Sequence, residues 1–480
     1  MKFHKLHLGK AKCAVDLGDG SERGEYVCQD YILHKLGRPH RNINLMYCYY
    51  PLDKEWPRRA SEVSQTNNAS NAWGYCYDDY FPYQHRDVKR FDDDVKTDFV
   101  IMRDIRKHGQ DVTLTLTIDC GVPDNDLIRI ARDLKSFGRM HLRINHEATG
   151  TWFAFSKRYS YQQVADFFVK FHNIIKKEAP NIRTVLCVGG IKDPDKHEIE
   201  YEKEFTEALR TTDIWSIDNY IALHWGWPYD IAEPGINNHK IAPVDQIHDL
   251  NKRSYERFKF LNNGVYKDIV LSELNADGDV TGNALQPEIV KEFYNKIKDG
   301  KYDFYSAITM YQFRDQGRLG LEQEDPNNKD IGIEQPLLQV YKNIIADPHF
   351  QPAMPVSEEI QLPAKLRWGS AEDSDGIAIP VEFEKHPVFC EVTFEEPLNL
   401  MMEINGRWFY KAPEVKTIDL MPAFFDRKIK NGSTLRLNIF APPPAGENDS
   451  TQGEDWAENY YAELTLEPSF RIRYQPAAMA

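Results

Sequence analysis

The sequence is poor in the features that mark a membrane protein or a nucleic-acid-binding protein. No apolar run among its 480 residues is long enough to cross a bilayer. The first twenty residues lack the apolar core of a signal peptide, so we expect a cytoplasmic protein, or a secreted one if a leader segment precedes them. The 59 Lys and Arg are outnumbered by 74 Asp and Glu, which gives a formal net charge of −15. Because nucleic acids and anionic membranes attract basic surfaces, this charge argues against both as partners.

Several motifs of known sites are also missing. The seven cysteines are scattered, odd in number and without a CxxC pair, which favours free thiols in a reducing compartment over a disulfide scaffold. Neither a CxxC pair nor an HExxH motif is present to form a zinc site. No GxGxxG follows the first predicted strand, which argues against a dinucleotide-binding domain. We therefore expect neither a metal nor a cofactor, and the sequence does not indicate the oligomeric state.

Strand-like and helix-like segments instead alternate regularly up to about residue 348. Residues 112–118 alternate apolar residues with threonines, which is typical of a strand. Residues 125–138 place their apolar side chains on one helical face, and residues 160–180 open with Ser160 and Gln163 at the spacing of a capping box. The whole pattern predicts eight strands, each followed by a helix, near residues 12–17, 42–50, 112–119, 140–147, 182–188, 213–220, 268–273 and 304–312. Eight such units over roughly 350 residues favour a (β/α)8 TIM barrel, an α/β fold, over an open doubly wound sheet.

The pattern changes after residue 350. Residues 351–361 are rich in proline and are predicted to be a linker between a barrel of residues 1–350 and a second domain of residues 362–480. The second domain contains short strands separated by turns, which predicts a small all-β sandwich. Its Trp408, Phe409 and Tyr410 could bind carbohydrate, but packing against the barrel is the favoured interpretation.

Two glutamates end predicted barrel strands. Glu147 ends the fourth strand and Glu273 ends the seventh, and the active sites of TIM barrels lie at these carboxyl ends. Strands four and seven lie across the mouth from each other, so the two carboxyl groups can flank one bond. Glycoside hydrolysis needs this arrangement, with one group to protonate the leaving oxygen and one to attack the anomeric carbon.

The stretch "RINHEATGTWF" resembles the acid/base motif of glycoside hydrolase family 26, a β-mannanase-like family of clan A. "SELN" resembles the nucleophile strand of that clan, and "DIWSIDNY" resembles its sixth strand, whose terminal tyrosine supports the nucleophile. The chain departs from family 26 at Phe155, where a Trp is usual, and in its eighth strand, which offers Tyr311 and Phe313 in place of a Trp. A neighbouring family of the same clan therefore stays open.

The resemblance implies a retaining β-glycosidase with an oligo- or polysaccharide substrate. Glu147 would be the acid/base and Glu273 the nucleophile, and β-mannan or β-glucan would be candidate substrates. The other residues that we expect to position the carboxylates or to bind the sugar are Arg143, Asn145, His146, Trp152, Tyr220, His224, Trp225, Trp227 and Trp73. On strand parity Arg143, Asn145 and Glu147 would all point into the barrel.

Three alternatives remain open from the residues alone. The protein could be a non-catalytic carbohydrate-binding barrel, although the presence of both glutamates speaks against that. It could be an exo-acting β-glycosidase of a neighbouring family. A metal-dependent hydrolase would need clustered His and Asp at strand ends, for which Asp119 with His224 is a poor set.

Overall fold

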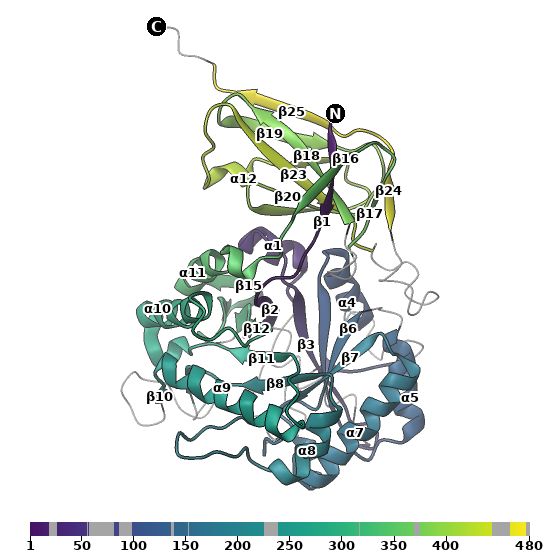
Figure 1. Cartoon of the computed structure of the whole chain (residues 1–480), viewed down its shortest axis with the longest axis vertical. Helices are drawn as coiled ribbons and strands as arrows, with labels where there is room; N and C mark the ends of the chain where they lie inside the picture. Colours follow the sequence, from purple (N-terminus) through teal and green to yellow (C-terminus); the bar gives the residue numbers. More distant parts are fainter. Residues whose placement is uncertain are drawn as a thin grey trace.

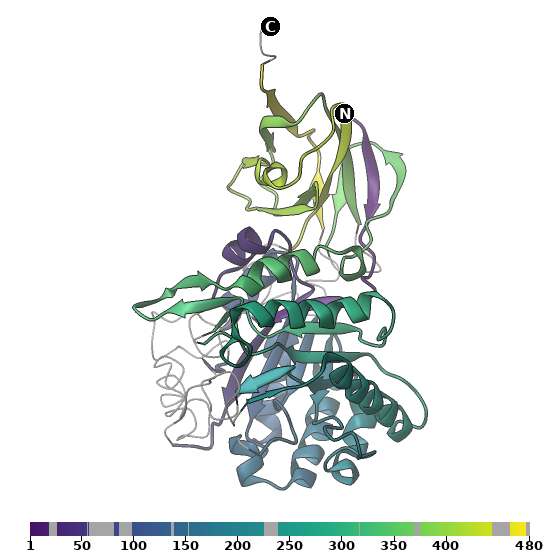
Figure 2. The ribbon, with the colours of Figure 1, turned by 90° about the vertical axis from the view of Figure 1, so that its left-hand side faces the viewer.

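A computed structural model describes residues 1–18, 26–54, 56, 81–85, 98–135, 139–151, 153–224, 239–315, 317–368, 375–443 and 461–476. The chain forms a barrel with a smaller β-rich part stacked beyond one end of it (Figure 1). The view turned by 90° shows the same stacking, and the N-terminal strand lies in the smaller part in both views (Figure 2).

The larger part is a closed, eight-stranded parallel barrel, as predicted. Its strands are β2 (Ala14–Gly18), β3 (Asn42–Tyr49), β5 (Asp111–Ile118), β6 (Met140–Ile144), β7 (Ile182–Cys187), β8 (Ile214–Asp218), β11 (Ile269–Leu274) and β12 (Ala307–Met310). Each strand pairs in parallel with the next, β12 pairs with β2, and the β2–β3 pairing closes the ring. Every residue of β3 and β5 is buried, because the strands are covered on both faces.

Helices cover the outside of the barrel. Those that follow the strands are α1 (Gln29–Leu36), α4 (Asp98–Lys107), α5 (Asp124–Lys135), α6 (Ala154–Arg158), α7 (Tyr161–Glu178), α8 (Glu202–Thr211), α9 (Val244–Leu261), α10 (Gly278–Lys298) and α11 (Pro336–Ile344). The capping box predicted for α7 is confirmed, because Ser160 accepts from the Gln163 backbone and the Gln163 side chain accepts from the Ser160 backbone. No helix among the described ranges is long and apolar enough to cross a membrane.

Short elements extend the barrel at the strand ends. β4 (Phe81–Pro82) pairs beside β3, and β9 (Ala222–His224) forms a hairpin with β10 (His239–Ile241) after the sixth barrel strand. β13 (Arg314–Asp315), β14 (Glu322–Asp325) and β15 (Asn328–Glu334) form a small sheet after the eighth.

The smaller part is an antiparallel β-sandwich. Its larger sheet has the order β16 (Val356–Ile360), β1 (Phe3–His7), β18 (Asp375–Phe383), β23 (Ser433–Phe440), β20 (Leu400–Ile404) and β21 (Arg407–Lys411). The facing sheet has the order β22 (Thr417–Asp419), β19 (Pro387–Thr393) and β25 (Ser469–Tyr474), and β17 (Ala364–Leu366) pairs with β24 (Ala462–Leu464). Apolar side chains of both sheets form one core together with α12 (Pro422–Phe425).

The predicted domain boundaries need two corrections. β1 lies in the sandwich and not in the barrel, because it pairs with β16 on one side and with β18 on the other. The predicted linker of residues 351–361 contains β16, which is the edge strand beside β1. Both ends of the described chain therefore belong to the sandwich.

The sandwich packs against the side of the barrel where the strands begin. The Trp408 backbone donates to the carbonyl of Gly37, just before β3, and Asn399 donates to the carbonyl of Lys107, just before β5. Trp408 is buried beside Leu33 of α1, and Phe409 is buried in the sandwich core. These contacts support the packing role favoured for the aromatic motif.

Candidate active site

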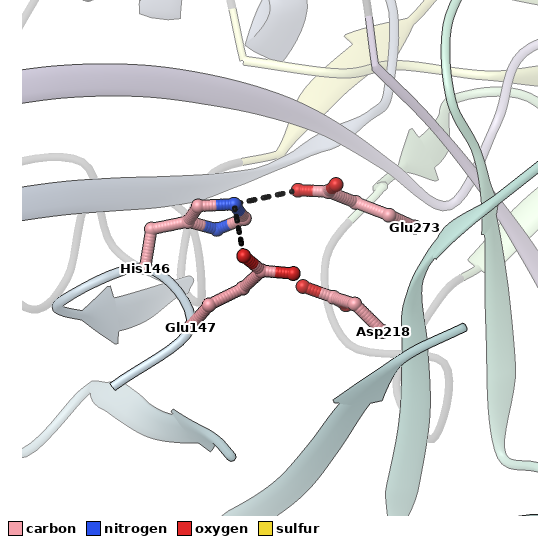
Figure 3. Close-up of side chains that lie close together, drawn as sticks. All are labelled: His146, Glu147, Asp218 and Glu273. Atoms are coloured by element: carbon pink, nitrogen blue, oxygen red, sulfur yellow. Dashed lines mark ion pairs between the residues drawn. The ribbon is translucent and has the colours of Figure 1, made fainter. Parts of the chain in front are cut away.

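Four polar side chains meet at the mouth where the strands end. His146 and Glu147 follow β6, Asp218 is the last residue of β8, and Glu273 lies near the end of β11 (Figure 3). One nitrogen or oxygen from each of these side chains lies within 4.8 Å of the others. The structure thus brings together the two predicted glutamates, although they are 126 residues apart in the sequence.

Arg143 supports this cluster from inside the barrel. It is fully buried, and its Nε donates to the hydroxyl of Thr115, its register partner on β5, at 2.7 Å. Its guanidinium lies 3.2 Å from Glu273 Oε1 and 3.6 Å from Asp218 Oδ2. The guanidinium therefore places one fixed positive charge beside the carboxyl groups of Glu273 and Asp218.

Three side chains contact the Glu273 carboxylate. The Tyr220 hydroxyl donates to Oε2 at 2.7 Å, and Arg143 donates to Oε1 at 3.2 Å. His146 Nε2 lies 3.1 Å from the same Oε1, and the edge of Phe153 packs against its ring. Burial and the Arg143 charge lower the pKa of His146 well below its usual value, which keeps the ring neutral beside the carboxylate. These donors fix the carboxylate and favour its ionised form.

The end of β6 differs from its prediction. The strand stops at Ile144, three residues before Glu147, because Asn145 and Glu147 adopt left-handed backbone conformations with φ of 56° and 42°. Asn145 accepts from the Ile118 backbone and donates to the Cys120 sulfur. Its amide therefore bonds to the end of β5 and not to Glu273, and the expected contact of Asn145 with a sugar hydroxyl stays a prediction. Left-handed backbone in residues other than glycine carries strain that is often kept at functional sites.

Asp218 is the member of the cluster that the sequence analysis did not select. It pairs in register with Glu273 on the adjacent strand, and the Cys187 thiol donates to its Oδ2 at 3.2 Å. A single aspartate in "DIWSIDNY" carries no motif signal of its own. The available signal was positional, since Asp218 ends the barrel strand next to the one that carries Glu273.

Burial raises the pKa values of all three acids in this cluster. Burial, and then the charges of Asp218 and Glu273, raise the pKa of Glu147 well above its usual range. Burial and Asp218 raise the pKa of Glu273 to about 8, against the opposing effects of Arg143 and Tyr220. Burial also raises the pKa of Asp218. Glu273 and Asp218 both accept hydrogen bonds, whereas no described residue donates one to Glu147. Hydrogen bonds stabilise the ionised form, so of the two glutamates Glu147 is the one that keeps its proton.

This proton makes the folded state sensitive to pH. The folded pKa of Glu147 lies above its unfolded value near 4.5, so stability falls as the pH rises through this interval. Glu147→Gln should therefore raise the free energy of unfolding at pH 8 by about 1.4 kcal/mol for each unit of that pKa rise. The gain should shrink as the pH falls towards 4.5 and should vanish below about pH 3.5, where Glu147 is protonated in both states. Urea unfolding at the two pH values measures it, and the exposed Glu382→Gln is the matched control. An equal change at both pH values would contradict the assignment.

Several predicted sugar-binding residues cannot be placed. Trp73, Trp152, Trp225 and Trp227 lie outside the described residues, and of His224 only the backbone is described, in β9. Their predicted stacking on sugar rings therefore stays a prediction. Tyr311 and Phe313 of the eighth-strand region are buried, and the Tyr311 ring packs edge-on against Tyr220.

The structure does not test the metal set named from the sequence, because the His224 side chain lies outside the described residues. Asp119 accepts from Arg158, Tyr159 and the Gly121 backbone and is thereby engaged in its own loop. Among the described residues, the group with metal-ligand geometry is His146, Glu147, Asp218 and Glu273. The Arg143 guanidinium beside two of these carboxylates supplies positive charge at the place where a cation would bind.

No protein-family model matches the chain, and no curated protein matches it either. Among solved structures it is similar to a family 26 endo-β-1,4-mannanase from Cellulomonas fimi, with 12% identity over 90% of this chain and 89% of that one and a TM-score of 0.41. It is similar to a family 39 glycoside hydrolase from Bacteroides cellulosilyticus WH2, with 10% identity over 89% and 80% of the two chains and a TM-score of 0.42. It is also similar to a family 51 α-L-arabinofuranosidase from Bifidobacterium longum, with 10% identity over 91% and 99% and a TM-score of 0.44. TM-scores this low do not support an assignment of the activity. The barrel fold is identified from the pairing order of its own strands.

Proposed function

We propose that the protein is a retaining glycoside hydrolase that cleaves β-linked glycans, with Glu147 as acid/base and Glu273 as nucleophile. The observation that carries the proposal is that two neighbouring carboxyl groups differ in their exposure and in their hydrogen bonds. Glu273 is 6% exposed and accepts hydrogen bonds from Arg143 and Tyr220, with His146 Nε2 3.1 Å from its Oε1. Glu147 is 25% exposed and receives none from the described residues. One group is thus kept as a fixed carboxylate and the other as a proton carrier in contact with solvent.

The two groups divide the reaction into two displacements. In the first step Glu147 gives its proton to the glycosidic oxygen while a Glu273 oxygen attacks the anomeric carbon, so that the bond to the leaving group breaks and an ester forms. In the second step the Glu147 carboxylate takes a proton from water, and the water oxygen displaces Glu273 from the anomeric carbon. Both displacements invert that carbon, so the product keeps the configuration of the substrate.

The spacing of the carboxyl groups supports retention. Their closest oxygens lie within 4.8 Å, near the roughly 5–5.5 Å separation of retaining enzymes. Inverting enzymes need about 6.5–9.5 Å, because a water molecule must fit between the base and the sugar.

The substrate is proposed from the resemblance of the motif around Glu147, which suggests β-mannan or β-glucan. The experiment described next determines the sugar and whether the enzyme acts in the endo or the exo mode. A panel of aryl β-glycosides and β-linked polysaccharides, with product configuration followed by NMR, tests the proposal. Hydrolysis with retained configuration supports it, whereas saccharide binding without turnover would identify a non-catalytic barrel.

A metal-dependent hydrolase is the second candidate, because four possible ligand atoms lie within 4.8 Å. Repeating the panel after treatment with a chelator separates the two candidates. The proposed mechanism predicts unchanged rates, since Arg143 and the protons of the acids already balance the charge of the cluster. Loss of activity on chelation, with recovery on adding a divalent cation, would favour the metal enzyme.

Asp218 should set the pH range of activity. Its negative charge raises the pKa of both Glu147 and Glu273. Asp218→Asn removes this charge, so both limbs of the pH profile of kcat/KM should move to lower pH. Asp268→Asn, which changes an exposed aspartate, should leave the profile in place. A lower rate without a moved profile would show that Asp218 acts only on the geometry.

A further inference from the structure

A second site lies at the seam between barrel and sandwich, away from the catalytic mouth. A cavity of about 300 Å³ is lined by four basic side chains, two from each part. Arg38 lies just before β3 and Lys342 lies on α11, while Arg407 begins β21 and Arg427 follows α12. Its volume is at the lower end of the range of small-molecule pockets.

The protein balances the positive charge of this cavity only in part, since Glu403 acts on Arg38 and Asp426 acts on Lys342 and Arg407. Asp426 is the one acidic side chain in the lining, which leaves a surplus of three positive charges in a chain whose net charge is −15. In the described part of the chain, no carboxylate lies within ion-pair distance of Arg38, Lys342, Arg407 or Arg427. Elsewhere on this acidic protein most buried guanidiniums have acidic partners, as Arg106 and Arg314 do.

The guanidiniums converge on the turn between β20 and β21. Arg38 donates to the Gly406 carbonyl at 3.2 Å, and Arg427 donates to the Asn405 carbonyl at 3.0 Å. Arg407 packs over Gly37 and donates to the His34 carbonyl at 2.8 Å. A Cβ at Gly406 would overlap Arg427, so this turn needs glycine both for its φ of 79° and to admit the guanidinium. Each of these guanidiniums uses one described hydrogen bond of its five N–H groups, which leaves donors for a ligand.

Holding these cations together has an energetic cost. Burial and the Arg427 charge lower the pKa of Arg38 to about 10. Burial, and then the charge of Arg407, lower the pKa of Lys342. Repulsion acts across the seam, because each part of the chain supplies two of the charges. An anion in the cavity would replace this repulsion with attraction and would hold the two parts together.

We propose that the cavity binds a phosphate group, carried by inorganic phosphate or by a small phosphorylated compound. A phosphate dianion neutralises two of the three surplus charges, whereas a single carboxylate would neutralise one. Its tetrahedral oxygens accept paired hydrogen bonds from arginine forks, and the Lys342 ammonium adds a point charge. The site is independent of the glycosidase proposal, since it shares no residue with the catalytic cluster.

Calorimetric titration of the full chain with inorganic phosphate and with a hexose phosphate, at constant ionic strength, tests the site. We expect saturable 1:1 binding, with the tighter of the two compounds identifying the source of the phosphate group. Lys342→Gln should weaken binding about tenfold or more, because it removes a charged hydrogen bond. Lys177→Gln is the matched control, since that lysine is 81% exposed on α7. Absence of saturable binding, or equal affinity in Lys342→Gln, overturns the proposal.

Thermal unfolding supplies a second measurement, and it distinguishes a lysine that binds phosphate from one that only supports the fold. In chloride buffer Lys342→Gln should unfold at a higher temperature than the wild type, because it relieves repulsion. In phosphate at the same ionic strength the order should reverse, because only the wild type binds phosphate tightly. A variant that is less stable than the wild type in both buffers would show that Lys342 supports the fold, and would overturn the proposal.

Discussion

Glu273→Ala is expected to abolish turnover of β-glycosides, with kcat lower by a factor on the order of 10⁴ or more. The alanine leaves no group to attack the anomeric carbon, and Glu147 alone cannot form the ester. The fold should persist, because Arg143 keeps Asp218 as a partner and one of three crowded acids is removed. Hydrolysis of an activated aryl β-glycoside measures the loss.

Two control variants show whether the carboxylate itself matters. Glu273→Gln keeps the shape and can still accept from Tyr220, but its amide cannot attack, so it should be as inactive as the alanine variant. Glu334→Ala removes an exposed glutamate on β15 and should retain full activity. If Glu273→Ala kept a tenth of the wild-type rate, Glu273 would not be the nucleophile.

The barrel was predictable because its signals are local. Each strand carries a short run of apolar or β-branched residues, each run is followed by a helical pattern, and the number eight follows from counting them. All eight predicted strands are present, and most bounds agree to within a few residues. The sandwich was likewise indicated by short strands between turns after residue 362.

The place of β1 was not predictable in this way. "FHKLH" is five residues long, and its partners β16 and β18 lie some 350 residues further along the chain. A local pattern can indicate a strand but does not identify a distant partner. The domain boundaries depended on that partner, which is why residues 3–7 were included in the predicted barrel range of residues 1–350.

The sequence selected several of the residues that the structure brings together, and their roles in a site stay predictions. The motif around Glu147 and the position of Glu273 selected the two acids, and Arg143, His146 and Tyr220 contact Glu273 as expected. Strand parity failed at Asn145, because a backbone with positive φ turns its side chain away from the strand's alternation. Which of the three acids keeps its proton depends on distances among side chains from three different elements. No spacing within the sequence predicts those distances.

Glu147→Ala should separate the two steps of the reaction. Substrates with poor leaving groups need a proton from Glu147, so their turnover should fall by about 10²–10⁴-fold. Aryl glycosides with good leaving groups need no proton, so they should still form the ester with Glu273. The second step then becomes slow because water lacks its base, and an initial burst of released phenol should precede a slow steady rate.

Azide should rescue this variant because it attacks without giving up a proton. The anion displaces Glu273 from the anomeric carbon and forms a glycosyl azide, and since both displacements invert, that azide has the β configuration. Azide added to Glu273→Ala would instead attack the intact substrate once and give the α-glycosyl azide. The two product configurations thus assign the acid/base and the nucleophile separately, and an α-azide from Glu147→Ala would mean that the roles of the two glutamates are exchanged.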